Sequence, residues 1–283
     1  MSGPPPVATG TAAVPNAGVA AVYALRADGL RKNYGSKVAV DGISFGVRAG
    51  EIVGLLGPNG AGKTTTINMI LGVLQPSAGD IRIEGIDLAR RRSQALAHTN
   101  FAAVYAALPG NLTVYQNLRF FSLIYDVARG PSRIEQLLDE FDLRRLRNTR
   151  SGVLSSGEQT RLALAKAMVN DPRLLLLDEP TASLDPSAAN LIRARIRAMA
   201  VRTGCGILWT SHNMYEVEET CDRVLFLSRG RILLEGDPRT LPHAHGASSL
   251  EELFIRLARE PLATEPLAAT ARPGKRDAPG ATP

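Results

Sequence analysis

Long apolar runs and abundant cysteines are both missing from this sequence of 283 residues. No apolar run approaches the roughly 20 residues that a bilayer-spanning helix needs, so we expect no membrane span. The first residues carry no basic stretch and are interrupted by prolines, which argues against a secretory signal. The two cysteines, Cys205 and Cys221, have neither metal-site nor disulfide spacing and predict a reducing compartment.

Aromatic residues are also scarce, at 5%, although the chain carries a net charge of +6. Surfaces that bind nucleic acid combine clustered basic residues with recognisable motifs. Here the charges are scattered and have no interleaved aromatics. Ordinary surface charge is therefore the favoured interpretation, and we expect no nucleic-acid partner.

The two ends of the chain have compositions typical of disordered segments. Residues 1–22 hold no charged side chain and are rich in Ala, Pro, Gly and Val, and residues 264–283 are similarly rich in Ala and Pro. Such segments cannot bury enough apolar surface to fold. We predict disordered tails at 1–22 and 264–283 around one domain at 23–263.

Short apolar runs alternate with helical patterns inside these limits. Strands with two apolar faces, separated by helices, predict a parallel sheet covered on both sides. The segment at about 90–170 interrupts the alternation and predicts a helical insertion. The expected strands are 51–57, 173–180 and 206–213, the expected helices are 64–74 and 186–202, and 223–236 is an expected hairpin.

The segment GPNGAGKTT fits the phosphate-binding pattern GxxxxGK[ST] between an apolar strand and a helix. Glycines let the backbone wrap around phosphate, and the helix N-terminus points at the anion. Lys63 is expected to reach the β- and γ-phosphates, and Thr64 to bind Mg²⁺. A glycine-rich turn with a chance lysine is the disfavoured alternative. The expected phosphate-binding residues are Gly57, Pro58, Asn59, Gly60, Ala61, Gly62, Lys63, Thr64 and Thr65.

Two carboxylates follow the apolar run at 174–177. We expect Asp178 to hold Mg²⁺ through water and Glu179 to polarise the attacking water. A solvated strand end would be the plain alternative, but ligand sites of open α/β sheets lie at the carboxyl ends of strands. His212 also follows a predicted strand, and we expect it to contact the γ-phosphate rather than to be merely structural.

Two further segments carry a family resemblance, LSSGEQTRLALAKAM at 154–168 and LLLLDEPTASLDP at 174–186. Together with the P-loop they resemble the ATP-binding subunits of ABC transporters over about residues 25–255. The resemblance implies an α/β fold: a P-loop NTPase core with a parallel sheet and flanking helices. It also implies an antiparallel β subdomain near the N-terminus and a helical subdomain at about 90–170.

The resemblance also assigns roles to single residues. Ser155 and Gly157 are implied to bind the γ-phosphate held by an opposite subunit, while Ser155 and Glu158 also fit a helix capping box. Asp185 is implied to couple the two sites of a dimer. Tyr34 is implied to stack on adenine, although a strand-edge tyrosine is the simpler alternative.

Two positions depart from the family pattern. Ser156 stands where the family has a glycine, and its Cβ is expected to crowd the approach of the partner's nucleotide. The family also carries a glutamine about eight residues before the motif that reads LTVYQNL here, at 112–118. In this sequence the corresponding position falls near Val104 or Tyr105, and neither side chain is equivalent to the glutamine.

The resemblance implies an ATPase subunit that binds ATP and Mg²⁺ and powers an integral membrane permease on a separate chain. We expect a homodimer, peripheral on the cytoplasmic face of the membrane. The segment SSLEELFIRLARE at 248–260 resembles a short helix found in bacterial exporter subunits whose permease is a separate chain. The resemblance therefore favours export. A soluble ABC ATPase that acts on ribosomes or DNA, and a hydrolysis-impaired partner subunit, remain alternatives. The uncharged stretch at 100–112 is expected to contact the permease, with a buried hinge as the alternative.

Overall fold

The computed structural model describes residues 22–103 and 108–259. The predicted tails at 1–22 and 264–283 therefore lie outside the described residues, apart from Val22. Within the described part of the chain, no helix is both long and apolar enough to cross a membrane.

A six-stranded sheet forms the centre of the molecule, in the order β10-β9-β3-β8-β7-β6. Strand β3 pairs in parallel with β8 and β9, β7 pairs in parallel with β6 and β8, and only β10 runs antiparallel. This mixed sheet with helices confirms the predicted α/β core. Its strands are β3 (Ile52–Leu56), β6 (Thr99–Ala103), β7 (Leu174–Asp178), β8 (Gly206–Thr210), β9 (Arg223–Ser228) and β10 (Arg231–Gly236).

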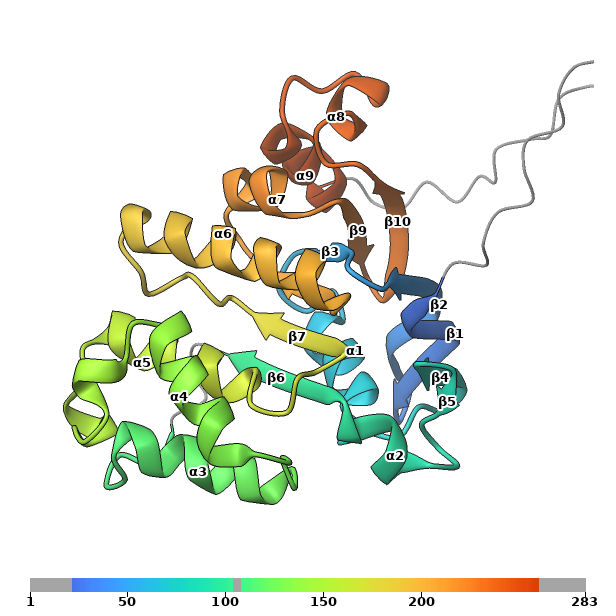
Figure 1. Cartoon of the computed structure of the whole chain (residues 1–283). Helices are drawn as coiled ribbons and strands as arrows, with labels where there is room; N and C mark the ends of the chain where they lie inside the picture. Colours follow the sequence, from blue (N-terminus) through green and yellow to red (C-terminus); the bar gives the residue numbers. More distant parts are fainter. Residues whose placement is uncertain (1–21, 104–107, 260–283) are drawn as a thin grey trace, which may run out of the picture.

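A second, antiparallel sheet stands beside the central sheet, and its strand β2 contacts β8 and β10 (Figure 1). Its order is β2-β1-β4-β5, and β1 and β2 form a long hairpin. The antiparallel subdomain implied near the N-terminus is therefore confirmed. Its strands are β1 (Tyr23–Tyr34), β2 (Lys37–Arg48), β4 (Ala78–Ile83) and β5 (Ile86–Asp87).

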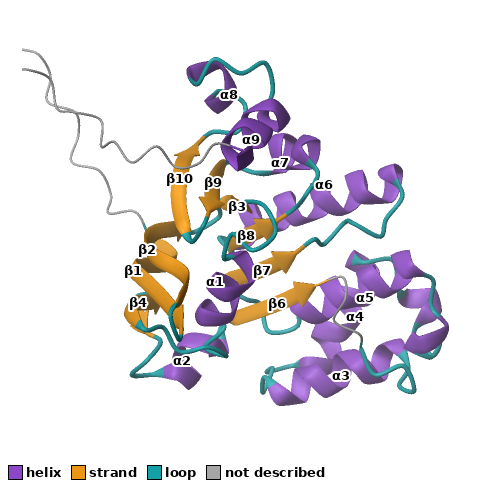
Figure 2. Cartoon of the chain, turned by 180° about the vertical axis from the view of Figure 1, so that it is seen from behind, coloured by secondary structure: helices purple, strands orange, loops and turns teal. Residues whose placement is uncertain are grey.

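Helices cover both faces of the central sheet, as the opposite views of Figures 1 and 2 show for α1 and α6. Helices α3, α4 and α5 gather beyond β6, on the side away from the antiparallel sheet (Figure 1). The helices are α1 (Lys63–Ile70), α2 (Arg92–Ala97), α3 (Val114–Ile124), α4 (Gly130–Glu140), α5 (Ser156–Ala167), α6 (Pro186–Thr203), α7 (Met214–Thr220), α8 (Leu241–Ala244) and α9 (Leu250–Arg259), with 3₁₀ turns at Arg144–Leu146 and Ser151–Val153.

The predicted helical segment at about 90–170 contains one strand that the sequence pattern did not reveal. Residues Thr99–Ala103 form β6, which pairs in parallel with β7 from Leu174 to Asp178. The segment is mainly helical as expected, and these five residues are the exception. The three helices of the insertion follow β6, and the capping box of Thr113 and Gln116 starts the first of them.

Alternation along the central strands divides the core into two layers. Leu175 and Leu177 of β7 pack in the cluster that includes α5 and α6, whereas Leu174 and Leu176 pack in the cluster that includes α1. Each fully buried leucine contributes about 2 kcal/mol through the burial of apolar surface. Because both faces of these strands are buried, the strands are held firmly in the core. The polar residues at the ends of β3, β7 and β8 therefore lie at one edge of the sheet.

Candidate functional site

The loop after β3 is built around glycines that no other residue could replace. A Cβ on Gly57 would lie 2.2 Å from the carbonyl oxygen of Leu227, and a Cβ on Gly62 would lie 2.6 Å from that of Ala39. Gly62 adopts φ +110° and is the N-cap of α1. The chain thus turns tightly from β3 into α1, so the N-terminus of that helix faces the space above the loop.

Lys63 places its ammonium group over this loop. Its Nζ donates hydrogen bonds to the carbonyl oxygens of Gly57, at 2.5 Å, and Pro58, at 3.2 Å. Burial lowers the pKa of Lys63, while the nearby carboxylates of Glu179 and Asp178 act in the opposite direction. The loop therefore holds a positive charge directly beside the backbone N–H groups that would bind an anion.

Thr210, at the end of β8, contacts both acidic residues at the end of β7, the carboxylate of Asp178 and the backbone of Glu179. Its hydroxyl donates to Asp178 Oδ1 at 2.5 Å and accepts a hydrogen bond from the Glu179 N–H at 3.2 Å. Thr210 belongs to none of the motifs recognised in the sequence. Its contribution depends on the register in which Asp178 lies opposite Thr210 on the neighbouring strand.

Glu179 and His212 contact each other at the same edge. Glu179 Oε1 lies 3.2 Å from His212 Nε2, and the His212 N–H donates to Glu179 Oε2 at 3.3 Å. Glu179 adopts φ +54°, a left-handed conformation that is costly for a residue with a Cβ. Burial raises the pKa of Glu179, although His212 and Lys63 lower it. A carboxylate with a raised pKa is a stronger general base.

These groups surround a single cavity of about 810 Å³. It brings together the P-loop, Tyr34, both carboxylates and His212, as the sequence analysis expected. Gly57 forms the base of the loop and is not part of the lining. The lining consists of Tyr34, Lys37, Val38, Ala39, Pro58, Asn59, Gly60, Ala61, Gly62, Lys63, Thr64, Thr65, Asp178, Glu179, His212 and Arg229.

Four residues of this lining were not predicted from the sequence: Lys37, Val38, Ala39 and Arg229. Arg229 belongs to the turn between β9 and β10, where the Gly230 N–H donates to the Ala61 carbonyl oxygen at 2.9 Å. No local motif marks these residues. Only the packing of the hairpins against the P-loop brings them to the cavity.

The donors present fit a nucleotide-bound Mg²⁺ ion. Mg²⁺ in such sites uses one or two protein oxygens together with phosphate and water oxygens. Thr64 and Asp178 line the cavity and offer a hydroxyl and a carboxylate. Among the described residues, no group of three or more His, Cys, Asp or Glu could hold a metal alone.

Ser155, Gly157 and Asp185 lie outside this cavity. Ser155 is the N-cap of α5, and its capping box with Glu158 is present, so that alternative is confirmed. Asp185 caps α6 by accepting hydrogen bonds from the Ser187 and Ala188 N–H groups at 3.0 Å. A role across a dimer stays a prediction for all three residues.

The position of Ser156 is compatible with the fold of this chain. Its side chain is exposed, and its Oγ lies 3.5 Å from the carbonyl oxygen of Ser183. A Cβ on the following Gly157 would meet only Leu184, at an ordinary 3.5 Å. Packing within the described chain therefore does not require glycine at either position.

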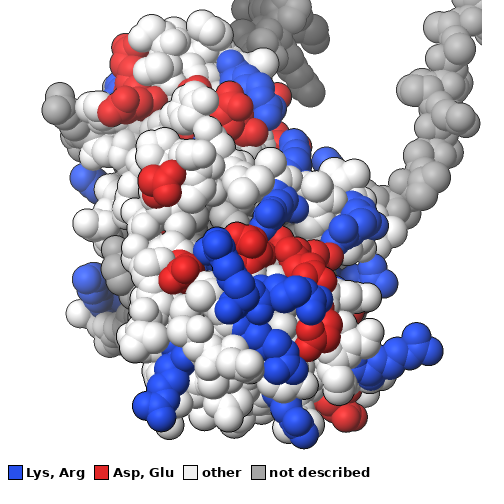
Figure 3. Space-filling model, turned by 60° about the vertical axis from the view of Figure 1, so that its left-hand side comes forward, with Lys and Arg blue, Asp and Glu red and all other residues white. Residues whose placement is uncertain are grey.

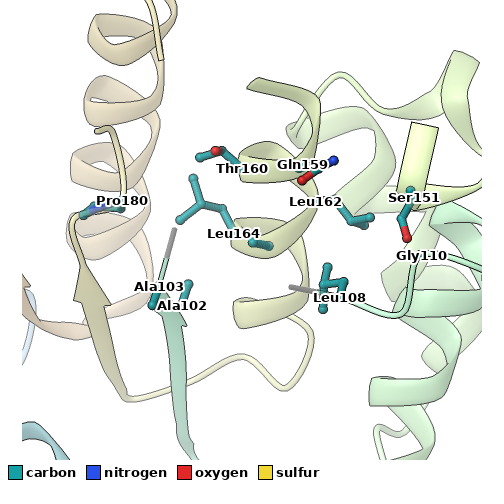
Figure 4. A pocket seen from close by; sticks show the side chains of 12 residues that line it. Ala102, Ala103, Leu108, Gly110, Ser151, Gln159, Thr160, Leu162, Leu164 and Pro180 are labelled. Atoms are coloured by element: carbon teal, nitrogen blue, oxygen red, sulfur yellow. The ribbon is translucent and has the colours of Figure 1, made fainter. Parts of the chain in front are cut away.

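A second cavity, of about 350 Å³, lies between the end of β6 and α5 (Figure 4). Part of the uncharged stretch at 100–112 lines it, through Ala102, Ala103, Leu108 and Gly110. The positions near which a glutamine was expected, Val104 and Tyr105, lie outside the described residues, as do Ala106 and Ala107. The described residues of this stretch therefore form β6 and part of the loop before α3, and some of them line the cavity.

The basic residues around the first 3₁₀ segment, Arg144–Leu146, are largely paired. Arg144 forms ion pairs with Glu135 and Asp139, and Arg147 forms one with Glu135. Figure 3 shows basic and acidic side chains interleaved on the face that it presents. The charge on this face is mixed rather than uniformly positive.

Residues 40–182 match the family model described as ABC transporter. The chain is also 41% identical, over 233 residues, to Nod factor export ATP-binding protein I of Paraburkholderia xenovorans, which covers 82% of this chain and 76% of that protein. The chain belongs to the ABC transporter family. It has the ATP-binding, ATPase domain of that family, as the motifs indicated.

Another relative and two solved structures are also similar to this chain over most of its length. The protein of the same name from Rhizobium sp. is 40% identical over 228 residues, covering 80% of this chain and 75% of that one. A solved ATP-binding subunit of an ABC transporter superposes with a TM-score of 0.75 at 30% identity, covering 83% of this chain and 99% of the other. CbiO1 from Clostridium perfringens, part of the ABC transporter complex cbiONQ, superposes with a TM-score of 0.72 at 28% identity, covering 84% and 96%.

Proposed function

We propose that this chain hydrolyses ATP in the cavity above its P-loop and thereby powers an integral membrane permease on a separate chain. The observation that carries the proposal is the contact between Glu179 and His212 opposite Lys63. A base, a cation and a helix N-terminus then surround the place where a γ-phosphate would lie. The folded unit in this proposal is one ABC ATP-binding domain at 23–263, whose helical subdomain follows β6.

Each group has a distinct task in this proposal. Lys63 and the loop N–H groups hold the β- and γ-phosphates, and Thr64 and Asp178 hold Mg²⁺, which neutralises phosphate charge. Glu179 accepts a proton from the attacking water. His212 orients the carboxylate of Glu179 and donates a hydrogen bond to the γ-phosphate, while Tyr34 stacks on the adenine ring.

We further propose that two copies close head to tail. Each P-loop would then face Ser155 and Gly157 of the other copy, where a hydroxyl and a helix N-terminus form an anion site. Within the described chain a Cβ on Gly157 would meet only Leu184, at 3.5 Å, so the start of α5 is open to a group from another copy, which supports this arrangement. Asp185 would connect the two sites.

The permease is proposed to dock at the cavity between β6 and α5, on the cytoplasmic face of the membrane. The cavity is lined mostly by small and apolar side chains, which suits a short helix of a partner. We propose export as the direction, because the similar proteins of Paraburkholderia and Rhizobium are named for export.

Purification of the tagged chain from membranes tests the proposal. An integral membrane protein should copurify with the chain, and its identity should narrow the cargo. A chain that sediments with ribosomes and leaves the membrane fraction would instead support the soluble ABC ATPase. A purified complex that binds ATP without turnover would support the hydrolysis-impaired subunit that Ser156 and the absent glutamine suggest.

A further inference from the structure

The buried carboxylate of Glu216, which is not part of the cavity lining, joins three segments of the chain. Glu216 of α7 is only 7% exposed, and the mechanism above gives it no task. Its Oε2 accepts hydrogen bonds from Thr181 Oγ1 at 2.7 Å and from Ser211 Oγ at 3.1 Å. Its Oε1 accepts one from Arg193 of α6 at 3.0 Å.

The two hydroxyl groups belong to the loops that carry the reacting side chains. Thr181 lies two residues after Glu179, and Ser211 lies directly before His212. A single oxygen atom therefore holds the loop after β7 and the loop after β8 together. The buried guanidinium of Arg193 balances the charge of Glu216 and fixes both loops to α6.

We propose that Glu216 is a positioning residue for hydrolysis, which keeps the loops of Glu179 and His212 at a fixed separation. This inference rests on the proposed function, because it takes Glu179 as the base. A contact of 3.2 Å between two groups on different loops persists only if the loops cannot drift apart. Small displacements of reacting groups are costly, and about 1 Å of misplacement can reduce turnover about 100-fold.

The cleanest test removes single hydroxyl groups and leaves Glu216 in place. Substitution of Glu216 itself would leave Arg193 as an unpaired buried charge and destabilise the fold. Thr181→Val and Ser211→Ala each release one loop from Glu216 and keep the ion pair, and Ser211→Ala also removes the hydrogen bond that Ser211 Oγ accepts from the Asn213 N–H at 3.0 Å. Thr220→Val is the matched control, because Thr220 Oγ1 is buried on the same helix and has no hydrogen-bond partner among the described residues.

We expect Thr181→Val and Ser211→Ala to reduce kcat for ATP about 10-fold to 100-fold relative to Thr220→Val. The KM and the affinity for ATP should match the control, because the P-loop lies on β3 and α1. Thr181→Ser, which retains the hydroxyl, should restore kcat. In a Glu179→Gln background, Thr181→Val should cause little further loss, because the two changes act through one group.

Values of kcat equal to those of Thr220→Val would overturn the inference, and so would a loss confined to ATP affinity. These outcomes leave the proposed function standing if the wild-type protein hydrolyses ATP and Glu179→Gln does not. A wild-type protein without ATPase activity, or a Glu179→Gln variant with full activity, would overturn the proposed function together with this inference.

Discussion

His212 Nε2 lies 3.2 Å from Glu179 Oε1, although the two residues follow different strands. The side chain of Glu179 is 16% exposed, whereas that of His212 is 65% exposed. The carboxylate is therefore partly withdrawn from water, and the imidazole remains open to the cavity. This asymmetry suits a base that must keep its proton affinity beside a group that must reach a phosphate.

Tyr34 provides a test of adenine stacking. It lines the cavity and is 51% exposed, so its ring is open to a ligand. Tyr34→Ala should weaken ATP affinity about 3-fold to 10-fold, the effect of losing one aromatic contact. Tyr34→Phe should bind normally. Titration with a fluorescent ATP analogue measures both, and Tyr215→Ala, an exposed tyrosine outside the cavity, is the control. Unchanged affinity in Tyr34→Ala would rule out the stacking role.

Lys63 is expected to be essential for nucleotide binding itself. Its ammonium group sits over the P-loop carbonyl groups, where phosphate charge would be neutralised. Lys63→Ala should reduce ATP affinity at least about 100-fold, since a charge-assisted contact to phosphate contributes about 3 kcal/mol. Equilibrium dialysis with labelled ATP measures this loss. Binding at wild-type strength would show that the P-loop assignment is wrong.

Lys166 gives the protein a pH-dependent stability that can be separated from catalysis. Its Nζ donates to the Phe101 carbonyl oxygen at 2.9 Å, and burial lowers its pKa from an ordinary 10.5. The unfolded chain therefore binds more protons between the lowered and the ordinary pKa, so Lys166 favours folding more as pH rises through that window.

Wild-type protein should thus gain Tm relative to Lys166→Met as the pH rises from neutrality toward 10.5. Thermal melts of both proteins in matched buffers give this difference, in which other titrating groups cancel. A Tm difference that stays constant, or that shrinks with rising pH, would contradict the assignment.

The cavity between β6 and α5 offers a test of permease docking. Ala163 lies on its wall, and Ala163→Glu would place a charge in a largely apolar lining. Copurification with the permease and transport should be lost, whereas ATP hydrolysis by the isolated chain should remain within about twofold. Ala194→Glu, on the exposed side of α6, is the control. Normal transport by Ala163→Glu would favour the alternative of a structural hinge.

Contiguous motifs made the central part of the site predictable. The P-loop, the two carboxylates and His212 each follow a strand with two apolar faces, and such strands place their ends at one edge. Thr210, Lys37 and Arg229 could not be predicted in this way. Each reaches the site through pairing or packing between segments far apart in the chain, which leaves no local pattern.

The strand β6 shows why part of the fold escaped prediction. Its sequence, TNFAA, is too short for periodicity to distinguish a strand from a helix. Its conformation is set by register with β7, and by the hydrogen bond from Asn100 Nδ2 to Asn170 Oδ1 at 2.8 Å. The helices that follow were predictable because caps and amphipathic patterns are local.

The most direct measurement is steady-state ATP hydrolysis by Glu179→Gln, with Glu251→Gln as a control on an exposed glutamate outside the cavity. If Glu179 is the general base, turnover should fall about 10²-fold to 10⁴-fold. ATP binding should persist, and the ATP-bound chain should accumulate as a dimer in size-exclusion chromatography. Hydrolysis at the wild-type rate would contradict the assignment of Glu179 and the account of the site built around it.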